Sequence, residues 1–125
     1  MKYFFALLLP LFFAGCAVSP EICRFTDADN GRSISVRTGE LFEVALTSNP
    51  STGFRWEAMP SPCRIESRDF HIPEERRARC GAAGTEKFLV RADFTGKCTL
   101  TFVYRRSWEN EPPAKTFSLE VNTRK

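Results

Sequence analysis

The sequence predicts an all-β fold, an antiparallel β-sandwich of about seven to eight strands. Short segments alternate apolar and polar residues, so each has one face to bury. Turn-forming Gly, Pro, Asn and Asp recur between these segments, and no long segment has the period of a helix. Phe is frequent, with 12 copies in 125 residues, and Val, Ile and Thr recur in short runs. This composition favours strands over helices.

The expected strands follow one another closely along the chain. The clearest lies at 41–47, where Phe42, Val44 and Leu46 face inward. Trp56 is expected in the core, because sandwich domains often bury a tryptophan on the equivalent strand. The remaining segments are bounded by turn residues, and 64–72 has the weakest pattern. In order, the expected strands are 22–26, 32–37, 41–47, 54–59, 64–72, 86–94, 98–104 and 115–122.

The polar segment 73–79 leaves two interpretations open. Pro73 suits the first turn of a helix, and acidic residues come before basic ones, as a helix dipole favours. A solvated loop explains the same composition and is the preferred interpretation.

The N-terminal segment has the features of an export signal. Lys2 precedes an apolar run, which is too short to span a bilayer comfortably and ends at Ala14-Gly15-Cys16. Small residues directly before a cysteine resemble the processing site of bacterial lipoproteins. That resemblance implies a signal peptide at 1–15, lipid attached to Cys16, a tether at 16–22 and one domain at 23–125. An ordinary secretion signal remains the alternative. We expect an exported protein anchored in a membrane, in the outer membrane or facing the periplasm.

Composition disfavours several classes of function. The net charge is only +3 with the two signs well mixed, so nucleic-acid binding has little support. The chain has a single histidine, His71, so a hydrolase that depends on histidine and a Cys/His metal site both have little support. We therefore expect no enzyme, cofactor or metal. Apart from Cys16, four cysteines remain, and an even count in an exported domain suggests two disulfides in one of three pairings.

The segment Asn49-Pro50-Ser51-Thr52-Gly53-Phe54 predicts a rigid loop that leads into an aromatic strand. Asn49 and Pro50 stiffen a turn, and Gly53 can adopt a positive φ at little cost. The segment Gly81-Ala82-Ala83-Gly84-Thr85-Glu86 is small and glycine-rich. The segment Tyr104-Arg105-Arg106-Ser107-Trp108-Glu109 places a tryptophan in a charged loop, where exposure is more expected than burial.

In this order, the three segments resemble the three binding loops of the chagasin family of cysteine-protease inhibitors, over nearly the whole length from Cys23 to Asn122. The resemblance implies an immunoglobulin-like sandwich that reversibly and non-covalently blocks papain-like cysteine proteases, as a monomer. Strands that alternate in direction place the three loops at one end, which agrees with it. The implied protease-binding residues are Asn49, Pro50, Ser51, Thr52, Gly53, Phe54, Gly81, Ala82, Ala83, Gly84, Thr85, Arg106 and Trp108.

Several details of this assignment are open at the level of sequence. Phe54 is equally compatible with the core and with support of the loop. Ser107 stands where the family has proline, so the third loop is expected to be less rigid.

The topology of strands that alternate in direction also places Cys63 and Cys98 at the far end, and Cys23 and Cys80 near the loops. It thus suggests the disulfides Cys23–Cys80 and Cys63–Cys98. The alternative function is an anchored immunoglobulin-like module that binds another surface or periplasmic partner.

Overall fold

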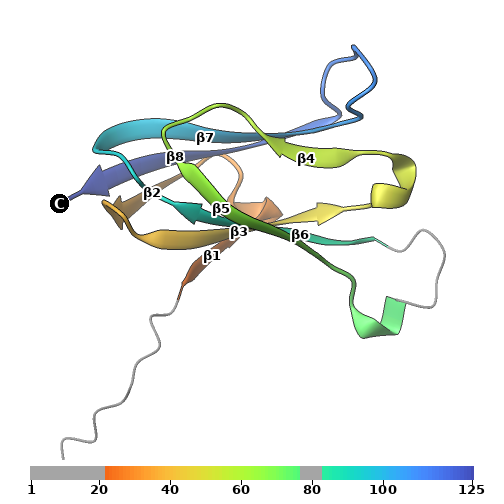
Figure 1. Ribbon diagram of the computed structural model, residues 1–125, viewed down its shortest axis with the longest axis horizontal. Coiled ribbons are helices and arrows are strands. Elements are labelled where there is room, and N and C mark those ends of the chain that lie inside the picture. The colour runs from red at the N-terminus through yellow and green to blue at the C-terminus, as the bar shows by residue number, and fades with distance from the viewer. Residues whose placement is uncertain (1–21, 77–82) are drawn as a thin grey trace, which may run out of the picture.

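The protein forms an immunoglobulin-like sandwich of two four-stranded β-sheets. The structure, a computed structural model, describes residues 22–76 and 83–125. One sheet has the order β1-β3-β6-β5 and the other the order β2-β8-β7-β4, and the two are stacked as layers (Figure 1). The strands are β1 (Cys23–Thr26), β2 (Arg32–Arg37), β3 (Leu41–Ser48), β4 (Arg55–Ala58), β5 (Arg64–His71), β6 (Gly84–Arg91), β7 (Gly96–Arg105) and β8 (Lys115–Arg124).

The alternation in sequence becomes the core between the layers. Inward-facing residues of the four central strands are buried, and aromatic rings join the sheets, as in the 4.6 Å centroid distance between Phe88 and Phe102. Burying such side chains is the main favourable term in folding. The fully buried set includes Phe42, Val44, Leu46, Val90, Leu100, Phe102, Phe117, Leu119 and Val121.

Most predicted strand boundaries agree with the structure within two residues, and β6 differs most. This strand begins at Gly84 rather than at residue 86 and ends at Arg91 rather than at residue 94. It begins early because Gly84 pairs with Ser48 of β3. A Cβ on Gly84 would collide with the His71 carbonyl and the Phe70 ring, so only glycine fits this close approach.

The segment after β5 contains a short helical turn. Residues Glu74–Arg76 form a 3-10 turn, and the Arg76 N–H donates to the Pro73 carbonyl at 2.9 Å. The preferred loop interpretation was therefore wrong here, because proline at the start of the turn presets its backbone. The rest of the predicted segment, 77–79, lies outside the described residues.

The pairing of the strands places the three loops together. The connections β3–β4 and β7–β8 lie at one end, together with His71, which ends β5, and Gly84, which begins β6. We call this end the loop end (right in Figure 1). The other end, which we call the opposite end, holds the turn between β2 and β3 and the turn between β6 and β7. At this end the Gly39 N–H donates to the Ala92 carbonyl at 2.7 Å. The predicted grouping is confirmed for the first and third loops and for the strand ends that flank the second.

The position of Cys23 corrects one prediction. The residue was expected near the loops, but β1 runs parallel to β3 and Cys23 pairs with Phe42, close to where β3 begins. Cys23 is therefore displaced toward the opposite end, where its thiol is exposed and free. Its expected partner Cys80 lies outside the described residues.

Cys63 and Cys98 lie next to each other at the opposite end, as predicted. Their Sγ atoms are 3.5 Å apart and both thiols are free. A disulfide is about 2.05 Å long, so the two atoms are in contact but not bonded. Burial, with a smaller effect from Cys98, raises the pKa of Cys63 to about 12.

Within the two described ranges, no helix is long and apolar enough to cross a membrane.

Candidate functional site

The first loop is a short 3-10 turn closed by glycine. Pro50–Thr52 form the turn, and Gly53 ends it with φ of 82° in the left-handed region. The Asn49 carbonyl accepts from the Thr52 N–H at 3.2 Å and from the Thr52 hydroxyl at 2.7 Å. The Ser51 hydroxyl donates to the Asn49 side chain at 2.6 Å. The loop is thus ordered by its own residues, which lowers the entropy lost on binding.

Three backbone carbonyls of this loop are turned to partners inside the protein. The Asn49 carbonyl accepts from Thr52, and the Pro50 carbonyl accepts from the Gly53 N–H at 2.9 Å. The Thr52 carbonyl accepts from the Arg106 Nε–H at 2.9 Å. Each of these carbonyl oxygens therefore already has a hydrogen-bond partner.

The third loop is bound to the first by two side chains. Arg106 lies with its guanidinium 4.5 Å from the centroid of the Phe54 ring, while its Nε–H holds Thr52. The Arg106 Nη1–H donates to the Glu109 carboxylate at 3.0 Å. The Trp108 indole lies over Gly53, where an added Cβ would collide with the ring. These contacts hold together two loops that are 54 residues apart in sequence.

Trp108 is 70% exposed although its ring touches Gly53. The expected exposure of this tryptophan is confirmed. An exposed indole supported from below is a large apolar surface that costs little entropy to bury.

Phe54 and Trp56 have different positions: Phe54 supports the first loop, and Trp56 belongs to the core. Phe54 is half-buried and stacks on Tyr104 with centroids 5.3 Å apart, so it supports the loop from below. Trp56 is 3% exposed, and its Nε1–H donates to the Thr47 carbonyl at 2.9 Å, which confirms its core position. The Tyr104 hydroxyl accepts from the Asn49 N–H at 3.0 Å. The base of the first loop therefore rests on β7.

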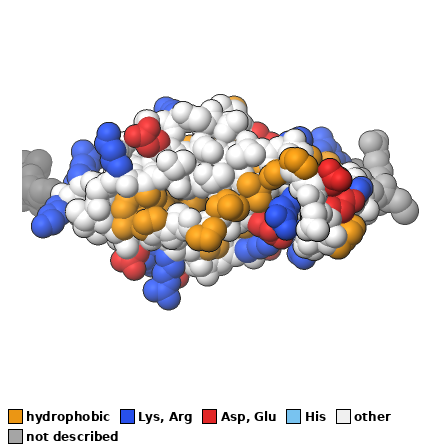
Figure 2. Space-filling view, turned by 90° about the horizontal axis from the view of Figure 1, so that it is seen from above, with side chains coloured by type: hydrophobic (Ala, Val, Ile, Leu, Met, Phe, Trp, Pro, Cys, Tyr) orange, Lys and Arg blue, Asp and Glu red, His pale blue; other side chains and the backbone are white. Residues whose placement is uncertain are grey.

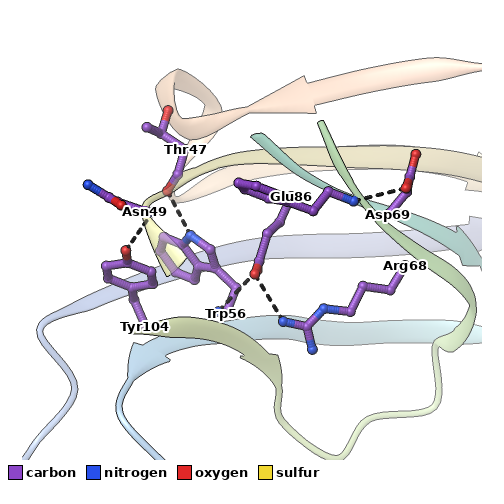
Figure 3. A network of polar contacts seen from close by, with 8 residues as sticks. Thr47, Asn49, Trp56, Arg68, Asp69, Glu86 and Tyr104 are labelled. Atoms are coloured by element: carbon purple, nitrogen blue, oxygen red, sulfur yellow. Dashed lines mark hydrogen bonds and ion pairs between the residues drawn. The ribbon is translucent and has the colours of Figure 1, made fainter. Parts of the chain in front are cut away.

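A buried carboxylate connects the strands beneath the loops (Figure 3). Glu86 on β6 is 2% exposed and accepts from the Trp56 backbone N–H at 3.1 Å. Its other oxygen accepts from Arg68 on β5 at 3.0 Å. The carboxylate thus joins β4, which follows the first loop, to β5 and β6, which flank the second. A buried charge with both a hydrogen bond and a cationic partner restricts how these strands can shift.

The second loop is described only at its ends. Ala83 is half-buried, while Gly84 and Thr85 lie in β6 rather than in a free loop. Thr85 pairs with His71 of β5. Gly81 and Ala82 lie outside the described residues.

Sequence reasoning missed the residues that join the loops. Glu86 was assigned to a strand without a role, although its place in an inward-facing alternation with Phe88 and Val90 marks an acidic residue in the core. Arg106 was expected to make polar contacts with a protease, but much of its side chain holds the first loop. No signal in a single sequence pairs Arg106 with Thr52.

Within residues 22–76 and 83–125, no group of three or more His, Cys, Asp and Glu side chains could hold a metal ion.

Comparisons with known proteins agree with this geometry. The family described as Chagasin family peptidase inhibitor I42 matches residues 35–121. The chain is 33% identical to chagasin from Trypanosoma cruzi over 91 residues, which covers 68% of this chain and 82% of that protein. Among solved structures, the cysteine protease inhibitor EhICP2 from Entamoeba histolytica superposes with a TM-score of 0.74 at 20% identity, over 82% of this chain and 96% of that one. The inhibitor PbICP-C, solved in complex with falcipain-2, superposes with a TM-score of 0.58 at 14% identity, over 82% and 99%.

Proposed function

Because the chain belongs to the chagasin family of peptidase inhibitors and inhibits cysteine proteases, we propose that its three loops form one surface that closes the cleft of a papain-like protease. The contact between the first and third loops carries this proposal. Trp108 lies on Gly53 and Arg106 holds the Thr52 carbonyl, so the two loops present themselves as one unit before any partner binds. Preorganisation of this kind raises affinity by lowering the cost of ordering.

The first loop is suited to covering a nucleophile without being cleaved. A cysteine protease attacks a carbonyl carbon and stabilises the resulting oxyanion with its own hydrogen-bond donors. The carbonyl oxygens of Asn49, Pro50 and Thr52 already accept hydrogen bonds inside the inhibitor. For these three peptides, the internal hydrogen bonds fix the direction of the carbonyl group, and turning the group toward an oxyanion hole would strain them. The loop therefore occupies the catalytic centre as a reversible, non-covalent wedge.

The other two loops extend the contact on either side of the wedge. Trp108 lies flat on an apolar wall beside the cleft, and the second loop pairs its backbone with a segment of the protease. Arg106 acts mainly through the first loop, which it holds. The proposed protease-binding residues are Asn49, Pro50, Ser51, Thr52, Gly53, Phe54, Gly81, Ala82, Ala83, Gly84, Thr85, Arg106 and Trp108.

Titration of papain with the chain from Ala17 onward tests this function. We expect a stoichiometric loss of activity, with the inhibitor recovered intact from the complex. No loss of activity at micromolar inhibitor, or steady cleavage of the first loop, would overturn the proposal.

A matched pair of glycine variants tests the role of the first loop. Gly53→Glu places a side chain where the Trp108 ring lies, whereas Gly39, with φ of 87°, has nothing within 4 Å of an added Cβ. Both variants carry the same backbone strain and the same charge change. We expect Gly53→Glu to abolish inhibition and Gly39→Glu to retain it at equal stability. Equal inhibition by both variants would remove the first loop from the interface.

The export signal supports a second, separable part of the proposal. Residues 1–15 direct export, and Cys16 carries a lipid that anchors the domain in a membrane, the outer membrane or one facing the periplasm. Metabolic labelling with a fatty acid tests the anchor. Label on the wild type and none on Cys16→Ser supports it, and an unlabelled wild type excludes it.

The contact between Cys63 and Cys98 supports a disulfide between them. Their Sγ atoms are 3.5 Å apart at the opposite end, and the exported location is oxidising. A small movement brings the two atoms to bonding distance. Peptide mapping without reductant is expected to give a Cys63–Cys98 peptide. Free thiols at both positions in the exported protein would contradict it.

A further inference from the structure

The opposite end of the sandwich carries an excess of basic side chains on one face. Arg37 ends β2, Lys97 is the second residue of β7, Arg124 ends β8, and Lys125 follows it. Val36 precedes Arg37 and Val121 lies three positions before Arg124, and both valines are buried. Because side chains alternate along a strand, Arg37 and Arg124 face outward on the same sheet. Figure 2 shows several Lys and Arg side chains at the left, the end away from the loops, and others among acidic side chains at the right. We call Arg37, Lys97, Arg124 and Lys125 the basic end.

Acidic neighbours neutralise this patch only in part, because three carboxylates, those of Glu40, Asp93 and Glu120, lie at this end with its four cations. Lys97 lies 3.8 Å from Glu120, and the Glu40 carboxylate accepts from the Arg37 backbone N–H at 2.7 Å rather than from its guanidinium. Arg64 and Arg91 lie at the same end but share Glu66. Among the described residues, no ion pair within 4.0 Å involves the side chains of Arg37, Arg124 or Lys125.

Two of these charges are placed where they repel each other. Arg37 and Arg124 are direct partners in the parallel ladder of β2 and β8, and both are exposed on the outer face. Like charges at paired positions destabilise a sheet. A third cation at Lys125 adds to the repulsion. An anionic surface laid against this end would relieve it.

The chain enters the domain toward this same end. Cys23 pairs with Phe42, near the beginning of β3, and residues 16–22 can span at most about 25 Å when fully extended. A lipid on Cys16 would therefore hold the opposite end of the domain close to the bilayer. The ten residues of β7 separate this end from the third loop by about 33 Å, so the loops would point away from the membrane.

We propose that the basic end docks on anionic phospholipid headgroups and orients the inhibitor with its three loops toward solvent. The orientation rests on the proposed lipid anchor and inhibitory surface, but the affinity for headgroups does not. Each basic side chain near an anionic leaflet strengthens binding about fivefold at moderate salt. The four residues of the basic end are enough for weak, salt-dependent binding that a lipid anchor makes lasting.

Vesicle sedimentation tests the docking in the absence of the lipid. The chain from Ala17 onward contains both sheets and the whole core, so it folds without Cys16. It is mixed with vesicles of phosphatidylcholine alone or with 30% phosphatidylglycerol. We expect binding only to the anionic vesicles, and release when salt is raised about tenfold.

Two double variants of equal charge decide whether the position of the charge matters. Arg37→Glu/Arg124→Glu is expected to weaken binding to the anionic vesicles at least tenfold. Arg55→Glu/Lys115→Glu makes the same charge change at the loop end and should stay within twofold of the wild type. Equal losses in both variants would show an effect of net charge alone and overturn the proposal. A wild type that does not bind anionic vesicles would also overturn it. Papain inhibition and fatty-acid labelling are measured separately, so their results would not be affected.

Discussion

The loop end and the opposite end of the sandwich satisfy their polar groups in different ways. At the loop end, side chains contact one another across the connections, as Arg106 does with Thr52 and Phe54. At the opposite end, backbone hydrogen bonds hold the turn between β2 and β3, such as that from Gly39 to Ala92. Charged side chains there remain exposed, Arg37 beside Arg124 among them.

This difference shows how a sandwich can present a fixed surface built from loops. A short turn held mainly by backbone hydrogen bonds to the adjacent turn, as Gly39 is to Ala92, offers little area to a partner. The longer connections of the loop end gain order from side chains that reach between them, with Glu86 joining the strands below. The loops of this end are thus both ordered and large enough to contact a partner. An inhibitor with such loops binds without a large entropic cost.

The largest expected effect comes from the carboxylate beneath the loops. Glu86→Ala leaves Arg68 without its partner and the Trp56 N–H without its acceptor in a buried site. We expect the free energy of unfolding to fall by about 3 kcal/mol or more, measured by urea denaturation. Glu66→Ala, at the opposite end, removes a half-exposed carboxylate that also pairs with arginine and should cost less than about 1 kcal/mol. Similar losses in both would mean that the loop end is no more dependent on its ion pair than the opposite end.

The next effect concerns affinity rather than stability. Trp108→Ala removes a side chain that is 70% exposed, so unfolding should change by less than about 0.5 kcal/mol. The inhibition constant for papain should rise about thirtyfold, because an indole at the centre of an interface contributes about 2 kcal/mol. Met59→Ala removes an apolar side chain that is 46% exposed, outside the three loops, and should leave inhibition unchanged. If Trp108→Ala inhibits as well as Met59→Ala, the tryptophan lies outside the interface.

The fold was predictable from the sequence, whereas the joining of the loops was not. Alternation identified the strands because one buried face is a property of each strand alone. Trp56 was placed in the core by analogy, because sandwich domains often bury a tryptophan on the equivalent strand. The parallel pairing of β1 with β3, and hence the position of Cys23, depends on which strands meet, and no local pattern encodes it.

The contacts of the candidate site depend on three-dimensional neighbours in the same way. The resemblance in sequence places Ser107 where the family is expected to have proline, and a looser third loop was expected. The structure places Arg106 and Trp108 on either side of Ser107 against the first loop, which supplies order from outside the segment. Local sequence shows what a loop lacks, but only the fold shows what supports it.

A smaller effect tests whether Arg106 acts by geometry or by charge. Arg106→Lys keeps the positive charge but cannot both donate to the Thr52 carbonyl and lie flat on Phe54. We expect the inhibition constant to rise about tenfold, which corresponds to about 1.4 kcal/mol, a typical value for a charged hydrogen bond. Arg37→Lys, at the opposite end, should leave inhibition unchanged. Full potency in Arg106→Lys would show that the charge alone is sufficient and that the first loop needs no support from the third.

The smallest effect belongs to the opposite end and appears only at alkaline pH. In the reduced protein, burial raises the pKa of Cys63 from 9.0 to about 12. Between these values the unfolded chain releases the thiol proton while the folded chain retains it, so stability is complete below about pH 9 and is lost as pH rises toward 12. At pH 10 we expect a loss of about 1 kcal/mol in urea denaturation with reductant present. Cys63→Ala should remove this loss, and Cys23→Ala, which changes an exposed thiol, should retain it. The same loss in Cys63→Ala would assign the alkaline sensitivity to another group and leave the opposite end without a buried titratable thiol of consequence.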